Sequence, residues 1–371
     1  MPAVIRIRRT TRALDEAISS DELEDLLTKT EAAIVAPPPA VPNDVLTHIN
    51  SWDYQVTDFD TPTLWGHALA LYESMDLIDK FSLQPEKLYC LIKRISMIYR
   101  DDRPFHNWQH GMSTAQATYY LLSQTTVGSA GLEDWHGLAL ITAALGHDLD
   151  HPGTSNTFQV NAGTSLALKY EGLSVLESHH SSILCHLLTA RGSDVFSHLS
   201  SESCKMIRSL VVSAILSTDM KVHHGVVTDF EAMTTASRDA PTKWEASSPK
   251  EQQLLAHVVL HAADLSNPGR SWPICNAWSA RINQEFNEQV EFEKSAGIPF
   301  APYMVTSSPA ERGSSEQGFF RFAIQPIWNP MVATFPDLDF VAKNISKNLS
   351  NFEAMAEGRS EGNGHSSTPA G

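Results

Sequence analysis

Residues 136–153 read HGLALITAALGHDLDHPG, a long apolar run that ends in two histidines and two aspartates. The run is too apolar for a surface helix and predicts a helix inside the protein. A buried helix that ends in so many polar groups carries a large desolvation cost unless a partner neutralises them. A divalent metal ion is the strongest such partner, so the stretch favours a metal site with His147 and Asp148 as ligands. The alternative, a surface helix end with a charge cluster, fits poorly with the apolar run.

Helical periodicity continues on both sides of this stretch, and strand alternation is hard to find. The clearest helical segments are residues 69–99, 132–145, 207–220, 252–263 and 277–292, the last closed by the C-cap glycine Gly297. We therefore expect an all-α catalytic domain over residues 46–355. Residues 1–45 are expected to form an N-terminal arm with a proline-rich linker, and residues 356–371 a disordered tail.

The composition narrows the class of protein. The chain has 371 residues, 27 Lys and Arg against 43 Asp and Glu, a net charge of −16, and 16 histidines. Such an acidic chain repels nucleic acid, so no nucleic-acid partner is expected. No membrane-spanning run and no secretory signal are evident, which predicts a cytoplasmic protein without integral membrane contact. The four scattered cysteines indicate neither a disulfide framework nor a cysteine zinc site.

Two further segments supply metal-binding residue types. In Phe105–His110, a helix that starts near Pro104 would place His106 and His110 one turn apart on one face, although such spacing also arises by chance. Asp264 ends another apolar run just before Asn267 and a proline, which alone is an ordinary helix terminus.

Together the three segments offer His110, His147, Asp148 and Asp264, a set suited to zinc with positions open for water. If one carboxylate bridges, a second ion such as magnesium could be held by that carboxylate and by waters. Two such ions would share a hydroxide and clamp a phosphoryl group. His106 would then face the leaving oxygen and donate its proton near neutral pH.

At these residues the chain resembles the catalytic domain of the class I 3′,5′-cyclic nucleotide phosphodiesterases. The resemblance is carried by HNWQH at 106–110, HDLDHPG at 147–153, ADLSN at 263–267, and the segments 156–159, 176–180 and 217–220. It implies a compact all-helical fold of the HD type, with about sixteen helices. It also implies a tightly held Zn²⁺ and a second ion, Mg²⁺ or Mn²⁺.

Residue roles follow from the same resemblance. His106 is similar to the proton donor to O3′, and Asp148 to the carboxylate that bridges the two metals. His151 is similar to a histidine beside the bridging hydroxide, Glu177 to a carboxylate near the metal waters, and Thr218 to a residue near magnesium-bound water. The implied nucleotide-binding set is His106, Asp148, Asp264, Asn267, Ile282, Glu316, Gln317 and Phe319, with Ile282 and Phe319 clamping the purine.

One position departs from the family pattern. The family places a glutamine two residues before a Gly-Phe pair, whereas this chain has Glu316 there, followed by Gln317 and then Gly318-Phe319. An ionised carboxylate only accepts hydrogen bonds, and guanine presents two adjacent N–H donors, so Glu316 in the pocket tilts the preference toward cGMP or weakens purine binding. A one-residue slip that turns Gln317 inward remains the other interpretation.

The resemblance implies hydrolysis of cAMP, cGMP or both to 5′-monophosphates, which ends cyclic nucleotide signals. Two alternatives stay open: another HD-type metal phosphohydrolase, and a weakly active sensor that binds cyclic nucleotide. A homodimer is also left open. Outside the site, His179 is expected to bond within the protein, and His223 and His224 to be solvated.

Overall fold

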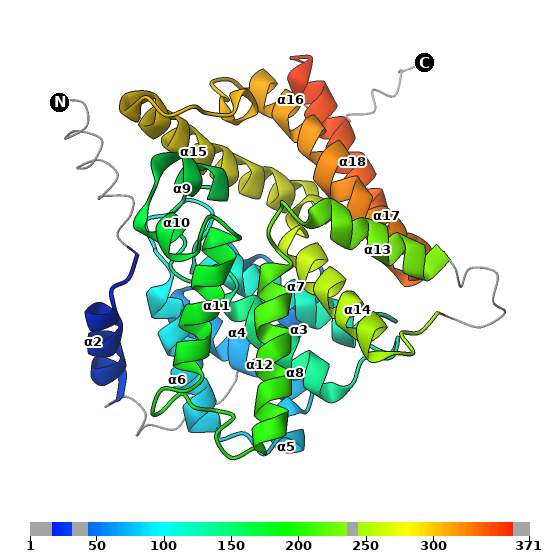
Figure 1. Cartoon of the computed structure of the whole chain (residues 1–371). Helices are drawn as coiled ribbons and strands as arrows, with labels where there is room; N and C mark the ends of the chain where they lie inside the picture. Colours follow the sequence, from blue (N-terminus) through cyan, green and yellow to red (C-terminus); the bar gives the residue numbers. More distant parts are fainter. Residues whose placement is uncertain (1–16, 32–43, 236–243, 359–371) are drawn as a thin grey trace.

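The computed structural model describes residues 17–31, 44–235 and 244–358, and within them every regular element is a helix (Figure 1). The predicted all-α class is therefore confirmed. The triple-proline stretch and the tail from residue 359 lie outside the described residues. No described helix is both long and apolar enough to cross a lipid bilayer.

The first half of the chain forms α2 (Ser20–Glu31), α3 (Val45–Ile49), α4 (Thr61–Ser74), α5 (Leu77–Lys80), α6 (Pro85–Ile98), α7 (Trp108–Ser123), α8 (Asp134–Gly146), α9 (Asn156–Ala162), α10 (Ser165–Lys169) and α11 (Val175–Leu187). The second half forms α12 (Ser201–Leu216), α13 (His223–Thr235), α14 (Pro249–Asp264), α15 (Trp272–Ala296), α16 (Pro309–Phe319), α17 (Gln325–Thr334) and α18 (Asp339–Ala356). Short 3-10 helices lie at Val56–Asp58 (η2), Asn267–Gly269 (η3), Pro302–Met304 (η4) and Pro336–Leu338 (η6), and a π-helical turn, η5, spans Phe320–Ile324.

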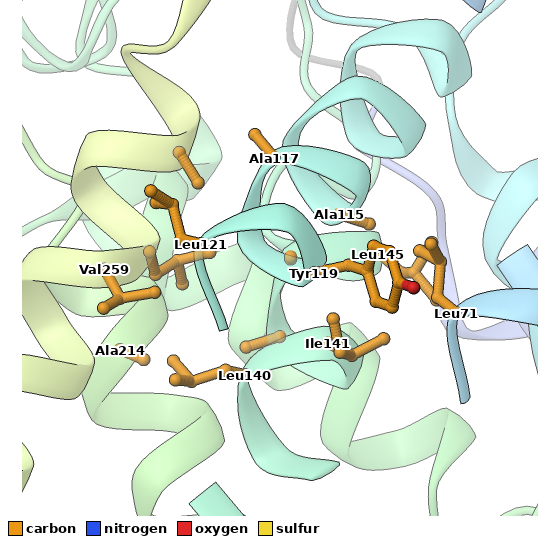
Figure 2. Packing of buried hydrophobic residues seen from close by; sticks show 14 of the residues in the cluster. Leu71, Ala115, Ala117, Tyr119, Leu121, Leu140, Ile141, Leu145, Ala214 and Val259 are labelled. Carbon is orange, nitrogen blue, oxygen red and sulfur yellow. The ribbon is translucent and has the colours of Figure 1, made fainter. Parts of the chain in front are cut away.

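Helix α8 lies at the centre of the core. Its apolar run is fully buried, and it packs against α7, α12 and α14 (Figure 2). Figure 2 shows Leu140, Ile141 and Leu145 of α8 among side chains of α4, α7, α12 and α14. Burial of each such side chain stabilises the fold by about 1.5–3 kcal/mol. The prediction that residues 132–145 form a buried helix is confirmed.

A second group of helices, α15 to α18, covers one side of this core. Helix α18 packs along α16 and also contacts α15 and α17 (Figure 1). Helix α15 ends at Ala296 and is capped by Gly297, whose φ of 68° is left-handed, so the predicted glycine cap is present. The turn η5 joins α16 directly to α17.

Candidate metal centre and substrate cavity

Three buried helices bring the predicted metal ligands to one point. His110 lies in the first turn of α7, His147 caps the end of α8 with Asp148 next to it, and Asp264 is the last residue of α14. Because α7, α8 and α14 pack against one another, their ends meet. The four side chains form one compact group whose ligand atoms all lie within 4.8 Å of one another.

The contacts within this group, which we call the His/Asp cluster, are short. His110 Nε2 lies 3.2 Å from Asp148 Oδ2 and 3.0 Å from Asp264 Oδ1. His147 Nε2 lies 3.2 Å and 3.1 Å from the same two oxygens, and the two Nε2 atoms are 3.2 Å apart. Ligand atoms about 2.0–2.1 Å from a tetrahedral zinc ion would be about 3.3 Å from each other, so these spacings fit such an ion.

The hydrogen bonding of the cluster also fits a cation. His147 Nδ1 lies 2.8 Å from the carbonyl oxygen of Ala144 and therefore donates to it. In the neutral ring Nε2 then carries a lone pair, which points at His110 Nε2 and at two carboxylate oxygens. Lone pairs that face one another across about 3 Å need a positive charge between them. Burial lowers the pKa of His147, yet Asp148 and Asp264 hold it well above the ordinary value, so the cluster favours positive charge.

His106 lies beside the cluster but not on the helix of His110. The prediction that both histidines share one helix face is wrong, because α7 begins at Trp108 and Asn107 is its N-cap. The Asn107 side chain accepts from the backbone N–H groups of Gln109 and His110, which fixes the helix start after His106. The two imidazole rings are nevertheless only 5.7 Å apart.

A carboxylate that was not expected from the sequence holds His106. Glu285 of α15 contacts His106 Nδ1 through its Oε1 atom. Its Oε2 atom accepts hydrogen bonds from the backbone N–H groups of Phe105 and His106, at 3.0 and 3.1 Å. Burial lowers the pKa of His106, but Glu285 outweighs it and the net effect is a rise to about 9. Glu285 therefore favours the protonated imidazole of His106 at neutral pH. The sequence places Glu285 and Gln289 at helical steps from Trp278, on one helix face, but nothing in that pattern links the face to His106.

His151 and His180 extend this histidine group. The ring of His151 stacks on that of His106 with centroids 3.8 Å apart and on that of His180 at 5.6 Å. His180 donates through Nδ1 to the carbonyl of Leu149, and its buried Nε2 has no hydrogen-bond partner in the structure and lies 3.7 Å from Asp148 Oδ1. His180 is not among the site residues predicted from the sequence.

Glu177 lies in α11, and Thr218 lies just past the end of the neighbouring helix α12. The amide of Asn156 donates to both carboxylate oxygens of Glu177, at 3.0 and 2.9 Å. Burial, with a contribution from the Asp219 charge, raises the pKa of Glu177 to about 7. Thr218 is buried just past the end of α12 and donates its hydroxyl to the carbonyl of Ile215 at 2.7 Å.

A cavity leads from Asp264 to Glu316. Its walls are Phe105, Asp264, Leu265, Asn267, Pro268, Cys275, Trp278, Ser279, Ile282, Glu316 and Phe319. Glu316 is 7% exposed and accepts from Ser279 Oγ at 2.7 Å and Asn283 Nδ2 at 3.1 Å, both on Oε1. Gln317 is only half-buried and does not line the cavity. The structure thus turns Glu316 inward, and burial raises the pKa of its carboxyl.

The other histidine expectations have mixed outcomes. His179 bonds inside the protein, as predicted, because its Nε2 lies 2.9 Å from Asp150 Oδ2. The expectation that His223 is solvated is wrong, since it is buried and its Nδ1 lies 2.7 Å from His261 Nε2. His224 is exposed.

Comparison with known families identifies the family to which most of the chain is similar. Residues 105–345 match the family described as 3′5′-cyclic nucleotide phosphodiesterase. Among solved structures, the phosphodiesterase domain of the rhodopsin phosphodiesterase from Salpingoeca rosetta is similar with a TM-score of 0.79 and 30% identity. That similarity covers 89% of this chain and 98% of that domain.

Three curated relatives illustrate the range of similar sequences. The 3′,5′-cyclic-nucleotide phosphodiesterase regA of Dictyostelium discoideum is 29% identical over 85% of this chain. The human high affinity cGMP-specific 3′,5′-cyclic phosphodiesterase 9A is 30% identical over 72% of the chain, and the mouse 3′,5′-cyclic-AMP phosphodiesterase 4C is 31% identical over 76%. The chain spans 39%, 43% and 42% of the lengths of these three proteins.

Proposed function

Because the chain belongs to the 3′,5′-cyclic nucleotide phosphodiesterase family, we propose that it hydrolyses 3′,5′-cyclic nucleotides to 5′-monophosphates and so ends cyclic nucleotide signals. The observation that carries this proposal is the position of the His/Asp cluster. It lies beside a protonated His106, and one of its members, Asp264, lines the cavity that reaches Glu316. A nucleotide bound with its phosphate near the cluster would place its base near Glu316, at the other end of the cavity.

We assign the metal ligands as follows. His110, His147, Asp148 and Asp264 would hold a tightly bound Zn²⁺, and Asp148 would also face a second ion, Mg²⁺ or Mn²⁺. Divalent ions bound there would neutralise phosphate charge and lower the pKa of a coordinated water. The buried, unpartnered Nε2 of His180 on the other side of Asp148 supports a second site at that carboxylate.

The protein side chains supply the remaining chemistry. His106 donates a proton to the departing O3′ from Nε2. Glu285 favours the protonated ring and fixes its orientation by accepting a hydrogen bond from Nδ1–H. His151 stacks against the His106 ring and limits its rotation. Glu177, with Asn156, and Thr218 complete the polar surroundings that we assign to the metal-bound waters.

The base-binding end of the cavity suggests the specificity. Ser279 and Asn283 both donate to Oε1 of Glu316, so a purine would meet Oε2, with Ile282 and Phe319 against its faces. Ionised Glu316 accepts the adjacent N–H donors of guanine and favours cGMP, whereas a protonated carboxyl offers both donor and acceptor, as an amide does.

Comparison of kcat/KM for cAMP and cGMP in wild type and in Glu316→Gln tests this specificity. We expect the variant to shift the ratio toward cAMP, by about tenfold, because one good hydrogen-bonded pair discriminates by about 1–3 kcal/mol. Gln317→Ala is the matched control and leaves the ratio unchanged. An unchanged ratio in Glu316→Gln refutes an ionised Glu316 as the source of a cGMP preference.

The function itself is tested by steady-state turnover of cAMP and cGMP, with chelator and with Mg²⁺ added back. We expect turnover that chelation abolishes and metal restores. Hydrolysis of linear phosphate esters but not of cyclic nucleotides would instead indicate another HD-type phosphohydrolase. Tight binding of cyclic nucleotide without product would indicate a sensor.

A further inference from the structure

The described residues 17–31, which we call the N-terminal strap, precede the stretch that matches the family, which begins at residue 105. The strap consists of three residues without regular secondary structure followed by α2. In Figure 1 α2, in dark blue, lies along the outside of the bundle next to α6. Leu23 and Leu27 of α2 are each 8% exposed and belong to the same core as α8.

Polar contacts fix the strap at both ends. At its C-terminal end the buried Arg94 of α6 donates from Nη2 to the carbonyl of Leu27 at 2.8 Å. At its start Ser19 and Glu22 cap α2 reciprocally: the Ser19 backbone N–H donates to the Glu22 carboxylate, and the Glu22 N–H donates to the Ser19 hydroxyl. Helix α2 therefore begins at a defined point, Ser20, two residues after Ile18.

Ile18 connects the strap to the loop that carries two site residues. Its backbone N–H donates to Asp150 Oδ2 at 2.7 Å. Asp150 lies between Asp148 and His151 in residues 147–153, which we call the HD loop.

The Asp150 side chain fixes the conformation of the HD loop. It is 5% exposed, and its φ of 59° is a left-handed conformation that costs a non-glycine residue about 1–2 kcal/mol. The surrounding structure must supply contacts that outweigh this cost. The Asp150 carboxylate accepts from three separate elements: Ile18, Arg100 after α6 at 2.8 Å, and His179 of α11 at 2.9 Å.

From these contacts we infer that the N-terminal strap positions the metal site: the Ile18 N–H, held in place by α2, fixes Asp150 and thereby the orientation of Asp148 and His151. Ile18 and Asp150 are positioning residues and do not touch the substrate. The inference rests on the proposed metal site for its effect on zinc, but the ordering of the HD loop by the strap does not depend on metal.

The test uses the full chain and removes the Ile18 donor. Ile18→Pro has no backbone N–H, whereas Ile18→Ala keeps the N–H and loses the side-chain packing. A second variant, Leu23→Ser with Leu27→Ser, releases α2 and leaves Ile18 unchanged. The first readout is zinc content after dialysis against graded chelator, well below the melting temperature of each variant. The second is amide hydrogen exchange over residues 147–153 in metal-free protein.

We expect Ile18→Pro and the double variant to lose zinc at about tenfold lower chelator concentration than wild type, and Ile18→Ala to stay within about twofold. Amide hydrogens of the HD loop should exchange about tenfold faster in the same two variants. A purely structural role of the strap would instead lower the melting temperature and leave zinc retention and amide exchange unchanged. Wild-type zinc retention and wild-type exchange in Ile18→Pro would overturn the inference. Wild-type protein that binds no zinc would refute the proposed metal site, and faster exchange in the variants would still support the strap.

Discussion

Replacing Glu285 with glutamine is expected to move the alkaline limb of the pH profile toward neutrality and to lower kcat/KM by up to about tenfold at pH 7.5. In the native protein Glu285 faces His106 Nδ1 with one oxygen and two backbone N–H groups with the other. In the variant the amide oxygen can still accept the backbone donors. The amide NH₂ then faces His106 Nδ1, and this favours the neutral ring.

The size of the effect follows from the pKa of His106. That pKa is about 9 with Glu285 in place, and the ordinary value of a histidine is 6.5. If His106 is the acid, activity falls as pH rises through its pKa. At pH 7.5 the protonated fraction is about 97% for a pKa of 9 and about 9% for a pKa of 6.5, so a fall of the His106 pKa to the ordinary value lowers activity about tenfold.

The assay is kcat/KM for a cyclic nucleotide between pH 6 and pH 10, at saturating metal. Glu288→Gln, on the exposed face of the same helix, is the matched control and should follow the wild-type profile. If Glu285→Gln loses activity by the same factor at every pH, Glu285 does not act through the protonation of His106 and the reasoning is refuted.

Three other predictions can be tested independently. Asp264→Ala removes a charged ligand of the His/Asp cluster and is expected to abolish turnover and zinc binding, whereas Asp229→Ala, at an exposed position, should change neither. Full zinc content with normal turnover in Asp264→Ala would contradict the ligand assignment. Gly111→Ala places a methyl group 2.6 Å from the buried Tyr99 hydroxyl and should lower the free energy of unfolding by about 1–3 kcal/mol. Gly225→Ala, with open space around it, should not destabilise, and equal melting temperatures for the two variants would argue against close packing of Gly111 on Tyr99. The folded-state pKa of Glu177, about 7, lies above its ordinary value of 4.5, so the free energy of unfolding of the metal-free protein, measured in urea, should fall as pH rises from about 4.5 to 7. Glu177→Gln should flatten that decline, and an unchanged slope would show that Glu177 is not the cause.

The sequence predicts the fold class and the His/Asp cluster because both depend on local patterns. The run of residues 138–145 is apolar on every side, which only a central helix can satisfy, and α8 occupies that place. His147, Asp148 and Asp264 each follow such a run. Buried polar groups need partners, and the groups at the ends of these helices can satisfy one another around a metal ion, so the cluster could be predicted without knowing how the helices are connected.

The rest of the site depends on tertiary contacts that local patterns do not contain. Glu285 lies 179 residues beyond His106, and only the packing of α15 against the start of α7 brings the two together. The start of α7 could have been predicted, because Asn107 is a strong N-cap residue and competes with the proline three residues earlier. The choice between Glu316 and Gln317 could not be made, since a shift of one residue turns a helix by about 100° and nothing local fixes the start of α16 to that accuracy.

The π-helical turn η5 has a consequence for how this protein can change over evolutionary time. On one side of it α16 turns Glu316 into the cavity, and on the other α17 buries Ile327 and Trp328 in the core. The Trp328 indole also donates to the carbonyl of Leu265, next to Asp264. A π turn holds one residue more than an α-helix of the same length. Losing that residue would rotate Glu316 out of the cavity or Trp328 out of the core, so insertions and deletions between residues 320 and 324 should be strongly selected against, even where single substitutions are accepted.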